Sequence, residues 1–431
     1  MSSPKLPLEI LTVVIDALAA SCSDDESLSE LMQSAALTCR AFVPLSRRHI
    51  FASVAIDDFN NPHRKPISPL EFANFFTEHS YLTKYIRELS ISILATTSQS
   101  ESAGEVENLF KTFLNIHGLE SLSISSSGIY AVMKLSDSPF SSAIQHLLQV
   151  PSLSRLRLSH LTEVPLDVLT TNLKHLSLES VNWKSTGEFS SFDMPPPDLE
   201  VLTFNSSHST RALLSLVRPD NQPVVSLKNL RRLEIMGMGE EILKICRMVA
   251  STSKVLASIY LSVCMHDGFT GLYDAISPSL NTLRHLVLVA CTEYQDLDPY
   301  QHACEELEKI AMAKIQTITF KVNTDCSIEG TNENNWDRID ELLTLGANWP
   351  YLTDVRLEVT IWRPKRPDRT FEPKVCFKRL LASKCIHFVY ECHNKVFTEK
   401  YITQSEGLRA VDVSHYTISS SSSLHANSTT I

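Results

Sequence analysis

Glycine is scarce in this chain: only 11 of its 431 residues are glycine. Glycine-rich loops that cradle phosphate groups therefore have little material, and a β-sandwich with many tight turns is also disfavoured. Long apolar runs are missing too, because no stretch reaches the ~18–20 residues that a membrane span requires. No basic segment followed by an apolar one precedes Leu6, so we expect neither a secretory signal nor a membrane partner. These absences favour a cytoplasmic protein, a nuclear protein, or one present in both compartments.

Recognisable catalytic motifs are absent as well. The chain contains no Gly-x-Ser-x-Gly elbow and no His-Glu-x-x-His helix. His302, Cys304 and Glu305 lie together on a predicted helix, but no third group orients them, and we interpret them as packing residues. We therefore expect a protein that is not an enzyme and that carries no cofactor. The net charge of −10 also argues against nucleic acid as a partner.

The ten cysteines form no Cys-x-x-Cys pair. With no disulfide framework and no secretory signal, they are expected to be reduced thiols. One group near the end of the chain contains two cysteines and two histidines: Cys385, His387, Cys392 and His393. Its spacing matches no standard zinc site, so core packing is the preferred interpretation and no metal is expected.

The first fifty residues hold three short apolar segments with helical spacing. The first begins at Pro7, a residue tolerated at the start of a helix, and its apolar positions fall on one helical face: Ile10, Leu11, Val14, Ile15 and Leu18. The second covers residues 28–37 after an acidic break at residues 21–27, and the third covers residues 42–51. Three short helices bury little surface among themselves, so such a unit tends to leave an apolar face for a partner.

This segment resembles the F-box, the helical module that docks substrate receptors onto the adaptor subunit of cullin-based ubiquitin ligases. The resemblance covers residues 6–51. It rests on Leu6-Pro7-x-Glu9-Ile10-Leu11, on Leu37-x-Cys39-Arg40-x-Phe42 and on the closing pair Ile50-Phe51. Residues 21–27 lengthen the connection between the first two helices beyond what the family usually shows. The resemblance implies that the adaptor-binding or supporting face is formed by Leu6, Pro7, Ile10, Leu11, Leu37, Cys39, Phe42 and Leu45.

A second pattern recurs through the middle of the chain: apolar, two polar, apolar, one polar, apolar. Its units begin at Ile86, Leu119, Leu153, Leu173, Leu199, Leu230, Leu256, Leu283, Ile315 and Leu352. The strict form Leu-x-x-Leu-x-[Leu/Ile/Phe] occurs more often than composition alone predicts, which is the signature of leucine-rich repeats. Each unit also leaves room for a helix opposite its strand, and helical spacing appears at residues 106–114, 242–249, 304–310 and 339–345.

The expected fold class is α/β, with an N-terminal three-helix F-box followed by an irregular leucine-rich-repeat solenoid that has a parallel sheet on its concave face. We expect five segments: the F-box (1–52), a linker and capping helix (53–85), the solenoid (86–395), a C-terminal cap or extension (396–413) and a disordered Ser/Thr-rich tail (414–431). The combination resembles a fungal type of F-box protein with degenerate repeats.

Polar residues between the repeat leucines are expected to face away from the core. Among them are the candidate target-binding residues: Arg155, Arg157, His175, Arg232, Tyr260 and His285. The basic members suit an acidic or phosphorylated segment of a target. The alternative interpretation is that they are ordinary solvated strand residues.

Two functional hypotheses follow from these features. In the first, the protein is the substrate-recognition subunit of an SCF-type ubiquitin ligase, whose F-box binds the adaptor and whose solenoid binds a protein target of unknown identity. In the second, it is a leucine-rich-repeat interaction scaffold unrelated to ubiquitin, and the N-terminal helices serve only as a cap.

Overall fold

The computed structural model describes residues 7–22, 25–57, 68–93, 103–126, 133–134, 141–184, 195–205, 213–218, 221–237, 240–263, 268–292, 300, 302–324, 333–345, 348–361 and 377–394. Its contacts divide the chain into two units, each described by itself below. Unit 1 comprises Met1–Ser262 and Gly271–Leu286, and unit 2 comprises Val263–Thr270 and Val287–Ile431. Among the described residues, every helix is too short or too polar to cross a membrane.

Three helices open unit 1: α1 (Leu8–Ala20), α2 (Asp25–Thr38) and α3 (Phe42–Ile50), and they pack against one another. They lie where the three apolar segments predict them. The acidic break is shorter than the sequence suggested, because α2 already begins at Asp25. Pro7 stands immediately before α1 in an extended conformation, and its carbonyl accepts the N–H groups of Ile10 and Leu11.

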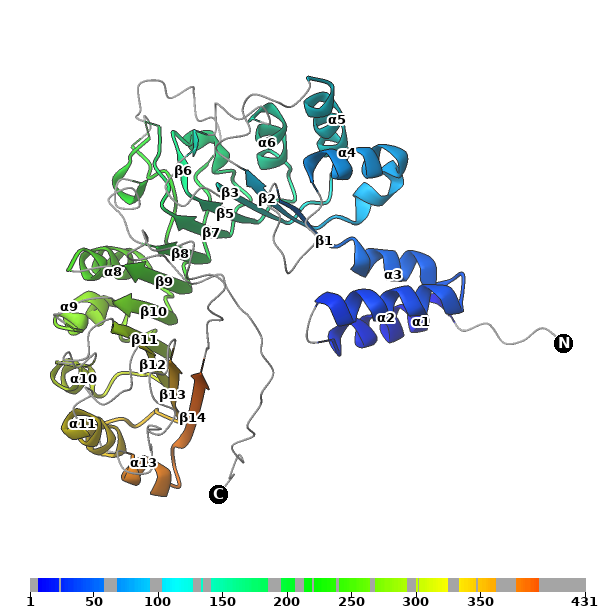
Figure 1. Cartoon of the computed structure of the whole chain (residues 1–431). Coiled ribbons are helices and arrows are strands. Elements are labelled where there is room, and N and C mark those ends of the chain that lie inside the picture. Colours follow the sequence, from blue (N-terminus) through cyan, green and yellow to red (C-terminus); the bar gives the residue numbers. More distant parts are fainter. Residues whose placement is uncertain are drawn as a thin grey trace, which may run out of the picture. The chain divides into compact units, whose positions relative to one another are not determined.

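A parallel sheet of twelve strands runs through the rest of the fold in the order β1-β2-β3-β5-β7-β8-β9-β10-β11-β12-β13-β14 (Figure 1). The first six strands are β1 (Ser53–Asp57), β2 (Glu88–Ile93), β3 (Ser121–Ser126), β5 (Arg155–Ser159), β7 (His175–Glu179) and β8 (Val201–Asn205). The others are β9 (Arg232–Gly237), β10 (Ser258–Val263), β11 (His285–Thr292), β12 (Thr317–Thr324), β13 (Asp354–Ile361) and β14 (His387–Asn394). The α/β class and the parallel sheet were therefore predicted correctly.

The apolar pattern explains where the strands lie. Each of the ten units found in the sequence contributes one strand to the twelve-stranded sheet, and that strand begins two residues after the first apolar position of its unit. In β3 the burial alternates along the strand: Leu122 and Ile124 are buried, whereas Ser121 and Ser123 are partly exposed. Alternate side chains of a strand point to opposite faces, so one face of the sheet is apolar and covered and the other is polar.

The same hydrogen bonds recur at the start of successive strands. The carbonyl of Ala52 accepts the N–H groups of Arg87 and Glu88, both at 2.8 Å, and the carbonyl of Arg87 then accepts those of Glu120 and Ser121. Equivalent paired bonds follow on the carbonyls of Glu120, Ser154, Lys174, Glu200, Arg231, Ala257 and Gln316. This recurrence sets the register in which neighbouring strands pair.

Helices connect the strands along the chain. Unit 1 contains α4 (Pro69–Glu78), η1 (Ser80–Tyr85), α5 (Ala103–Leu114), α6 (Ser141–Leu148), η3 (Leu166–Val168), α8 (Glu240–Thr252), α9 (Leu272–Ile276) and η4 (Ser277–Ser279). It also holds a small sheet of β4 (Met133–Lys134) and β6 (Leu161–Thr162). Helices α4, α5 and α6 lie side by side (Figure 1). The helices expected at residues 106–114 and 242–249 are present as α5 and α8.

Unit 2 contains α10 (Ala303–Ile310), α11 (Glu333–Thr344) and α13 (Lys378–Ala382). Large aromatic rings form its core. Tyr300 and Trp336 lie 4.8 Å apart between ring centroids, and Trp336 lies 5.4 Å from Phe377. The hydroxyl of Tyr300 donates to the carbonyl of Leu288 at 3.1 Å and to that of Lys321 at 2.9 Å, so this buried polar group is satisfied.

Residues 53–85 contain more than the expected linker and capping helix. Helix α4 and η1 fit that expectation, and α4 carries a capping box between Ser68 and Glu71. Strand β1 was not predicted. It pairs in parallel with β2, and its Val54 and Ile56 are buried beside α4. The segments expected as a C-terminal extension (396–413) and a tail (414–431) lie outside the described residues, as does Leu6.

Candidate functional site

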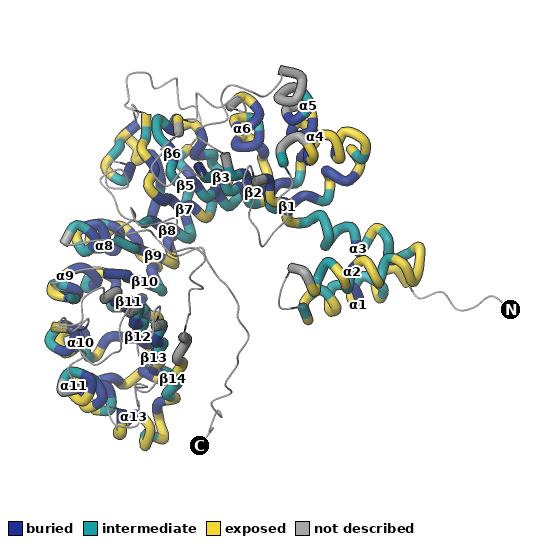
Figure 2. Tube along the Cα trace, in the orientation of Figure 1, coloured by how far each residue is buried: buried dark blue, intermediate teal, exposed yellow. Residues whose placement is uncertain are grey.

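The most unusual surface of unit 1 is the outer side of α1. A helix with one covered side normally has polar residues opposite it, but α1 has only Glu9, Thr12 and Asp16 among thirteen residues as clearly polar positions. Figure 2 shows the contrast: buried positions run along the sheet strands, whereas α1 to α3 are mostly exposed or half-buried. The N-terminal helices therefore lack the cover that the sheet has.

The apolar residues of α1 divide between two sides. Ile15 is fully buried, and Leu11, four residues earlier, is half-buried. Ile10, Val13 and Val14 are exposed, Val13 by 67%. At 100° per residue these three positions lie on the side of the helix away from Ile15. The single face proposed from the sequence is thus divided, since Ile10 and Val14 point outward while Leu11 and Ile15 point inward.

Polar contacts hold α1 against α3. The carboxylate of Asp16 accepts hydrogen bonds from Arg48 and from Nε2 of His49, the latter at 2.8 Å. Partial burial by itself would raise the pKa of Asp16, but the hydrogen bonds from His49 and Arg48 and their charges outweigh it, so the pKa is lowered. These contacts of Asp16, together with the burial of Ile15, hold α1 with its apolar outer side turned away from α3.

The other residues expected in the adaptor-binding face are distributed unevenly. Pro7 and Cys39 are exposed, and Leu37, in the last turn of α2, is 88% exposed. Phe42 and Leu45, at the start of α3, are half-buried, so they support the helices more than they form a surface. Sequence reasoning missed two exposed residues of α1, Leu8 and Val13. It placed Val14 on the apolar face of the helix but did not identify it as exposed. The signal was available, because Glu9, Thr12 and Asp16 occupy a single narrow stripe and the rest of the helix circumference is apolar.

The end of α3 contacts the elements that cover the first strands. The ring centroid of Phe51 lies 6.1 Å from that of Phe75 and 6.3 Å from that of Phe76, both in α4. The guanidinium carbon of Arg47 lies 5.3 Å from the ring centroid of Tyr81 in η1. The sequences of α1 and α2 contain no aromatic residue, so these contacts come from α3 and its C-terminal end.

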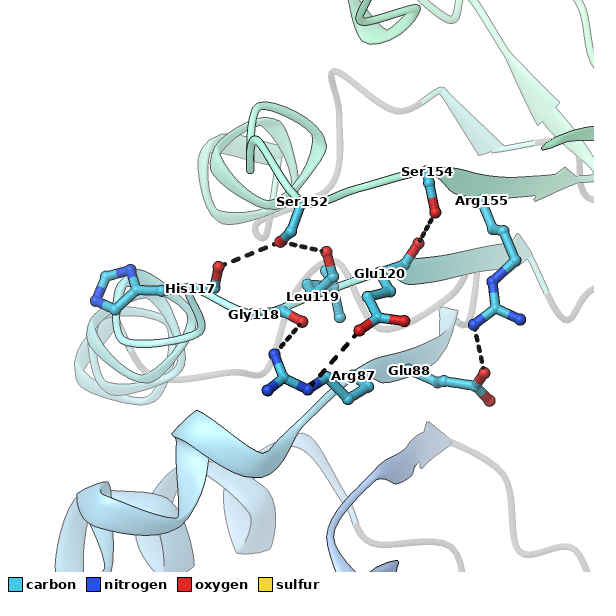
Figure 3. A network of polar contacts seen from close by, with 9 residues as sticks. All are labelled: Arg87, Glu88, His117, Gly118, Leu119, Glu120, Ser152, Ser154 and Arg155. Carbon is cyan, nitrogen blue, oxygen red and sulfur yellow. Dashed lines mark hydrogen bonds and ion pairs between the residues drawn. The ribbon is translucent and has the colours of Figure 1, made fainter. Parts of the chain in front are cut away.

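A second candidate surface is the polar face of the sheet, where the register brings distant residues together. Arg155 in β5, Ser121 in β3 and Glu88 in β2 occupy one row across three strands. Because the serine side chain is short, Arg155 reaches across it and donates from Nη2 to Oε1 of Glu88 at 2.7 Å (Figure 3). This candidate target-binding arginine is therefore already paired.

A related network lies beside that row (Figure 3). Nη1 of Arg87 donates to the carbonyl of Gly118 at 2.9 Å, and Nε of Arg87 lies 3.9 Å from the carboxylate of Glu120. A Cβ atom added at Gly118 would come within 1.9 Å of the Arg87 guanidinium. A side chain at position 118 would therefore displace the guanidinium group of Arg87.

Arg157 and Arg232 also face carboxylates. Arg157 donates to Oε2 of Glu179 at 3.3 Å, and Ser159 donates to the same oxygen at 3.1 Å. Arg232 forms an ion pair with Glu234. With Arg155 on Glu88, each of the three arginines thus lies against a carboxylate. The expected basic patch therefore has no excess of positive charge.

The strand register places His175 opposite Arg155 and in the same row as Arg232. His175 is exposed in β7, and its pKa is lowered, first by partial desolvation and then by the charges of Arg155 and Arg232, which outweigh the opposite effect of Glu200. It is therefore biased toward the neutral form. Tyr260 is half-buried in β10 and His285 is exposed at the start of β11.

The chemical motifs noted in the sequence have structural surroundings. Cys304 is buried in α10, with Sγ 3.7 Å from the carbonyl of Asn335, and Glu305 pairs with Arg338 at 3.0 Å. Cys385 is exposed, and Nδ1 of His387 lies 3.3 Å from Asp354. The side chains of residues 392 and 393 lie outside the description. Within the described part of the chain, no group of three or more His, Cys, Asp or Glu residues is placed to hold a metal ion.

Comparison of the sequence with protein-family models and with curated proteins gave no match.

Proposed function

We propose that this protein is the substrate-recognition subunit of an SCF-type ubiquitin ligase. In this proposal α1, α2 and α3 are the F-box that binds the adaptor subunit, and the sheet with its helices is an irregular leucine-rich-repeat solenoid that binds a protein target. The protein performs no bond chemistry itself. It raises the effective concentration of the target near the catalytic subunits, which transfer ubiquitin to lysines of the target.

The observation that carries the proposal is the exposed apolar side of α1. Ile10, Val13 and Val14 are exposed on a helix whose opposite side already packs on its neighbours. Fully burying an aliphatic side chain of this size is worth about 1.5–3 kcal/mol, so a partner that covers all three gains several kcal/mol. Helix-in-groove recognition uses apolar positions spaced in this way. Leu37 adds a further exposed apolar group near the end of α2.

The repeat part of the proposal is supported by the recurrence of strands and hydrogen bonds. Ten apolar units in the sequence correspond to ten parallel strands, and paired backbone bonds recur at their starts. Arrays of this kind present one extended polar face to a partner. Because the arginines on this face are paired with carboxylates, we expect the target to be recognised through mixed polar contacts and not through an excess of negative charge.

One observation favours the alternative, an interaction scaffold in which α1 to α3 only cap the repeats. Phe51 and Arg47 of this region contact Phe75 and Tyr81, which belong to the elements covering the first strands. A cap requires these contacts but does not require an exposed apolar outer side on α1. Substituting an exposed apolar residue of α1 therefore distinguishes adaptor binding from a purely capping role.

The test is the variant Val13→Asp, with Val217→Asp as its matched control. Val13 is 67% exposed on α1 and Val217 is 54% exposed elsewhere in unit 1. Removing a central apolar anchor costs about 2–4 kcal/mol of binding, so Val13→Asp should weaken binding to the purified adaptor by roughly 30-fold to several hundred-fold. Val217→Asp should bind like the wild-type chain, and both variants should unfold within about 0.5 kcal/mol of it.

Binding is measured by calorimetry or by co-purification of the co-expressed pair. If the wild-type chain does not bind the adaptor, or if Val13→Asp binds it as well as Val217→Asp does, the proposal is wrong. In that case the scaffold function is favoured.

A further inference from the structure

The last described strand of the sheet is incompletely covered. In β13 the inward-facing side chains Val355 and Leu357 are 1% and 0% exposed. In β14 the residues at the same register positions are Phe388 and Tyr390, and both are only half-buried. Phe388 stacks on Phe377 with ring centroids 5.1 Å apart, which covers one side of it. Larger rings are thus left less covered than smaller aliphatic groups one strand earlier.

The backbone of β14 also has an outer side. Among the described strands, β14 stands at the end of the order and pairs only with β13. The N–H of His387 donates to the carbonyl of Thr353 in the preceding unit at 2.7 Å. Successive residues of a parallel strand direct their backbone groups to alternate sides, so the N–H and C=O of Phe388 point away from β13. Such an edge is a template for a further strand.

The sequence contains a further unit at the right distance. Residues 408–413 read Leu-Arg-Ala-Val-Asp-Val, which is the order apolar, two, apolar, one, apolar found in the earlier units. Asp354 pairs with His387, so the unit start Leu352 corresponds to position 385 in the unit of β14. Leu408 follows 23 residues after position 385. Starts of the earlier units lie between 20 and 37 residues apart.

We propose that residues 408–413 of this same chain pair in parallel with the outer edge of β14 as the next strand. In the register of the preceding pairs, Val411 lies opposite Phe388 and Val413 lies opposite Tyr390, and the two valines cover the half-buried rings. This inference goes beyond the proposed function, because it concerns the other end of the sheet and is independent of what α1 binds.

The charge pattern agrees with this register. Asp412 then lies opposite Val389, in the row that also contains Arg356. The ion pair between Arg356 and Glu358 is long, because the nitrogen and the oxygen lie 4.0 Å apart. The pair Arg155–Glu88 in unit 1 is a precedent for a charge pair that reaches across one intervening strand. Asp412, the polar residue between the two valines, would thus share a row with the cationic Arg356.

The test is hydrogen exchange of β14 in the full-length chain, read by mass spectrometry on peptides that cover residues 387–394. In the proposed register the N–H of Ala410 donates to the carbonyl of Ile386, and Ala410→Pro removes that donor. Its matched control is Ala426→Pro, in the same C-terminal region but outside the proposed strand. Ala410→Pro should make the β14 amides exchange at least about tenfold faster, whereas Ala426→Pro should leave them unchanged.

A second variant, Val411→Asp, places a charge against Phe388 and should have the same effect as Ala410→Pro while keeping the backbone donor. Equal β14 exchange in the wild-type chain and in both segment variants would overturn the proposal. Protection of β14 that rises with protein concentration, together with a dimer in sedimentation, would also overturn it, because a second copy would then occupy the edge.

Discussion

Asp340 provides the sharpest stability test in unit 2, because one carboxylate joins two helices. The side chain belongs to α11 and is 2% exposed. Its two oxygens accept the backbone N–H groups of Arg379 and Leu380, each at 2.8 Å. These are orphan donors of the first turn of α13, which has no side-chain cap of its own. Asp340 thus caps α13 from a neighbouring helix, 40 residues earlier in the chain.

The magnitude follows from what is left behind when Asp340 is changed to alanine. Hydrogen bonds to a charged group contribute about 1.5–3 kcal/mol each, and the N–H of Leu380 would remain buried without its partner. The carboxylate is costly to bury, which offsets part of this sum. We expect Asp340→Ala to destabilise unit 2 by about 2–4 kcal/mol. Asp340→Asn retains one acceptor oxygen and should cost about 1–2 kcal/mol.

The pH dependence has a definite sign. Burial raises the pKa of Asp340 above its ordinary value, although the N–H groups of Arg379 and Leu380 act in the opposite direction. When the pKa of a carboxyl group is higher in the folded state than in the unfolded state, its contribution to stability is fully present below the unfolded-state pKa. That contribution is lost as the pH rises through the folded-state pKa. The stability advantage of the wild-type chain over Asp340→Asn should therefore increase as the pH falls from 7 toward 4.

Urea denaturation of the full-length chain at pH 7 and near pH 4 measures both effects, followed by tryptophan fluorescence, because three of the four tryptophans, Trp336, Trp349 and Trp362, belong to unit 2. The control is Asp337→Ala, which removes an exposed carboxylate from the same helix and should stay within about 0.5 kcal/mol of wild type. If Asp340→Ala unfolds at the same urea concentration as Asp337→Ala, the capping argument is refuted. A wild-type advantage over Asp340→Asn that shrinks with falling pH would refute the pKa argument.

Two further predictions concern unit 1. The pKa of Asp16 is lowered by His49 and Arg48 beyond the opposing effect of burial, so Asp16→Asn should lose about 0.3–1 kcal/mol at pH 7. Thermal unfolding should show that the wild-type advantage is present above the unfolded pKa and disappears as the pH falls through the folded one, and an advantage that persists at pH 2 would contradict this. Gly118→Ala forces the Arg87 guanidinium to move. Because that side chain is flexible and partly exposed, denaturation should show a loss below about 1 kcal/mol, and a loss above about 2 kcal/mol would show that the backbone itself must shift.

The sheet strands were predictable because their cause is local. In most units an apolar residue precedes the strand and two more lie within it, as Leu119, Leu122 and Ile124 do, and all three are fully buried. Strand β1 fits the same pattern through Phe51, Val54 and Ile56 and begins two residues after Phe51, but Phe51 was assigned to the third N-terminal helical segment, so this unit was not recognised. It forms because β2 offers an edge and α4 covers its apolar side, and both of these elements come later in the chain.

The polar face was predictable in its position but not in its charge. The alternation of Arg155 and Arg157 with leucines correctly placed them away from the core. Their partners, Glu88 and Glu179, lie 67 and 22 residues away in sequence and meet them only through the strand register. Counting basic residues therefore overestimated the positive charge of this surface.

The outer side of α1 was ambiguous for a different reason. Periodicity identifies a buried face when polar residues mark the opposite side, and α1 has too few of them to do so. Ile10 and Ile15 belong to the same broad apolar stripe, yet only Ile15 is buried. The burial of Ile15 and the contacts of Asp16 with Arg48 and His49 together hold that side inward. Tertiary contacts thus leave exposed the surface on which the proposed function depends.

The two ends of the sheet face the same physical requirement, since an end strand leaves apolar side chains without a neighbour. At the first end the requirement is met: Val54 and Ile56 of β1 are buried, and α4 with its phenylalanines lies against that strand. At the last end Phe388 remains half-buried although Phe377 stacks on it. An apolar residue aligned with Phe388 is needed there. Val411 is that residue if residues 408–413 pair with β14 in the proposed register. The same rule that explains why β1 is covered therefore predicts what covers β14.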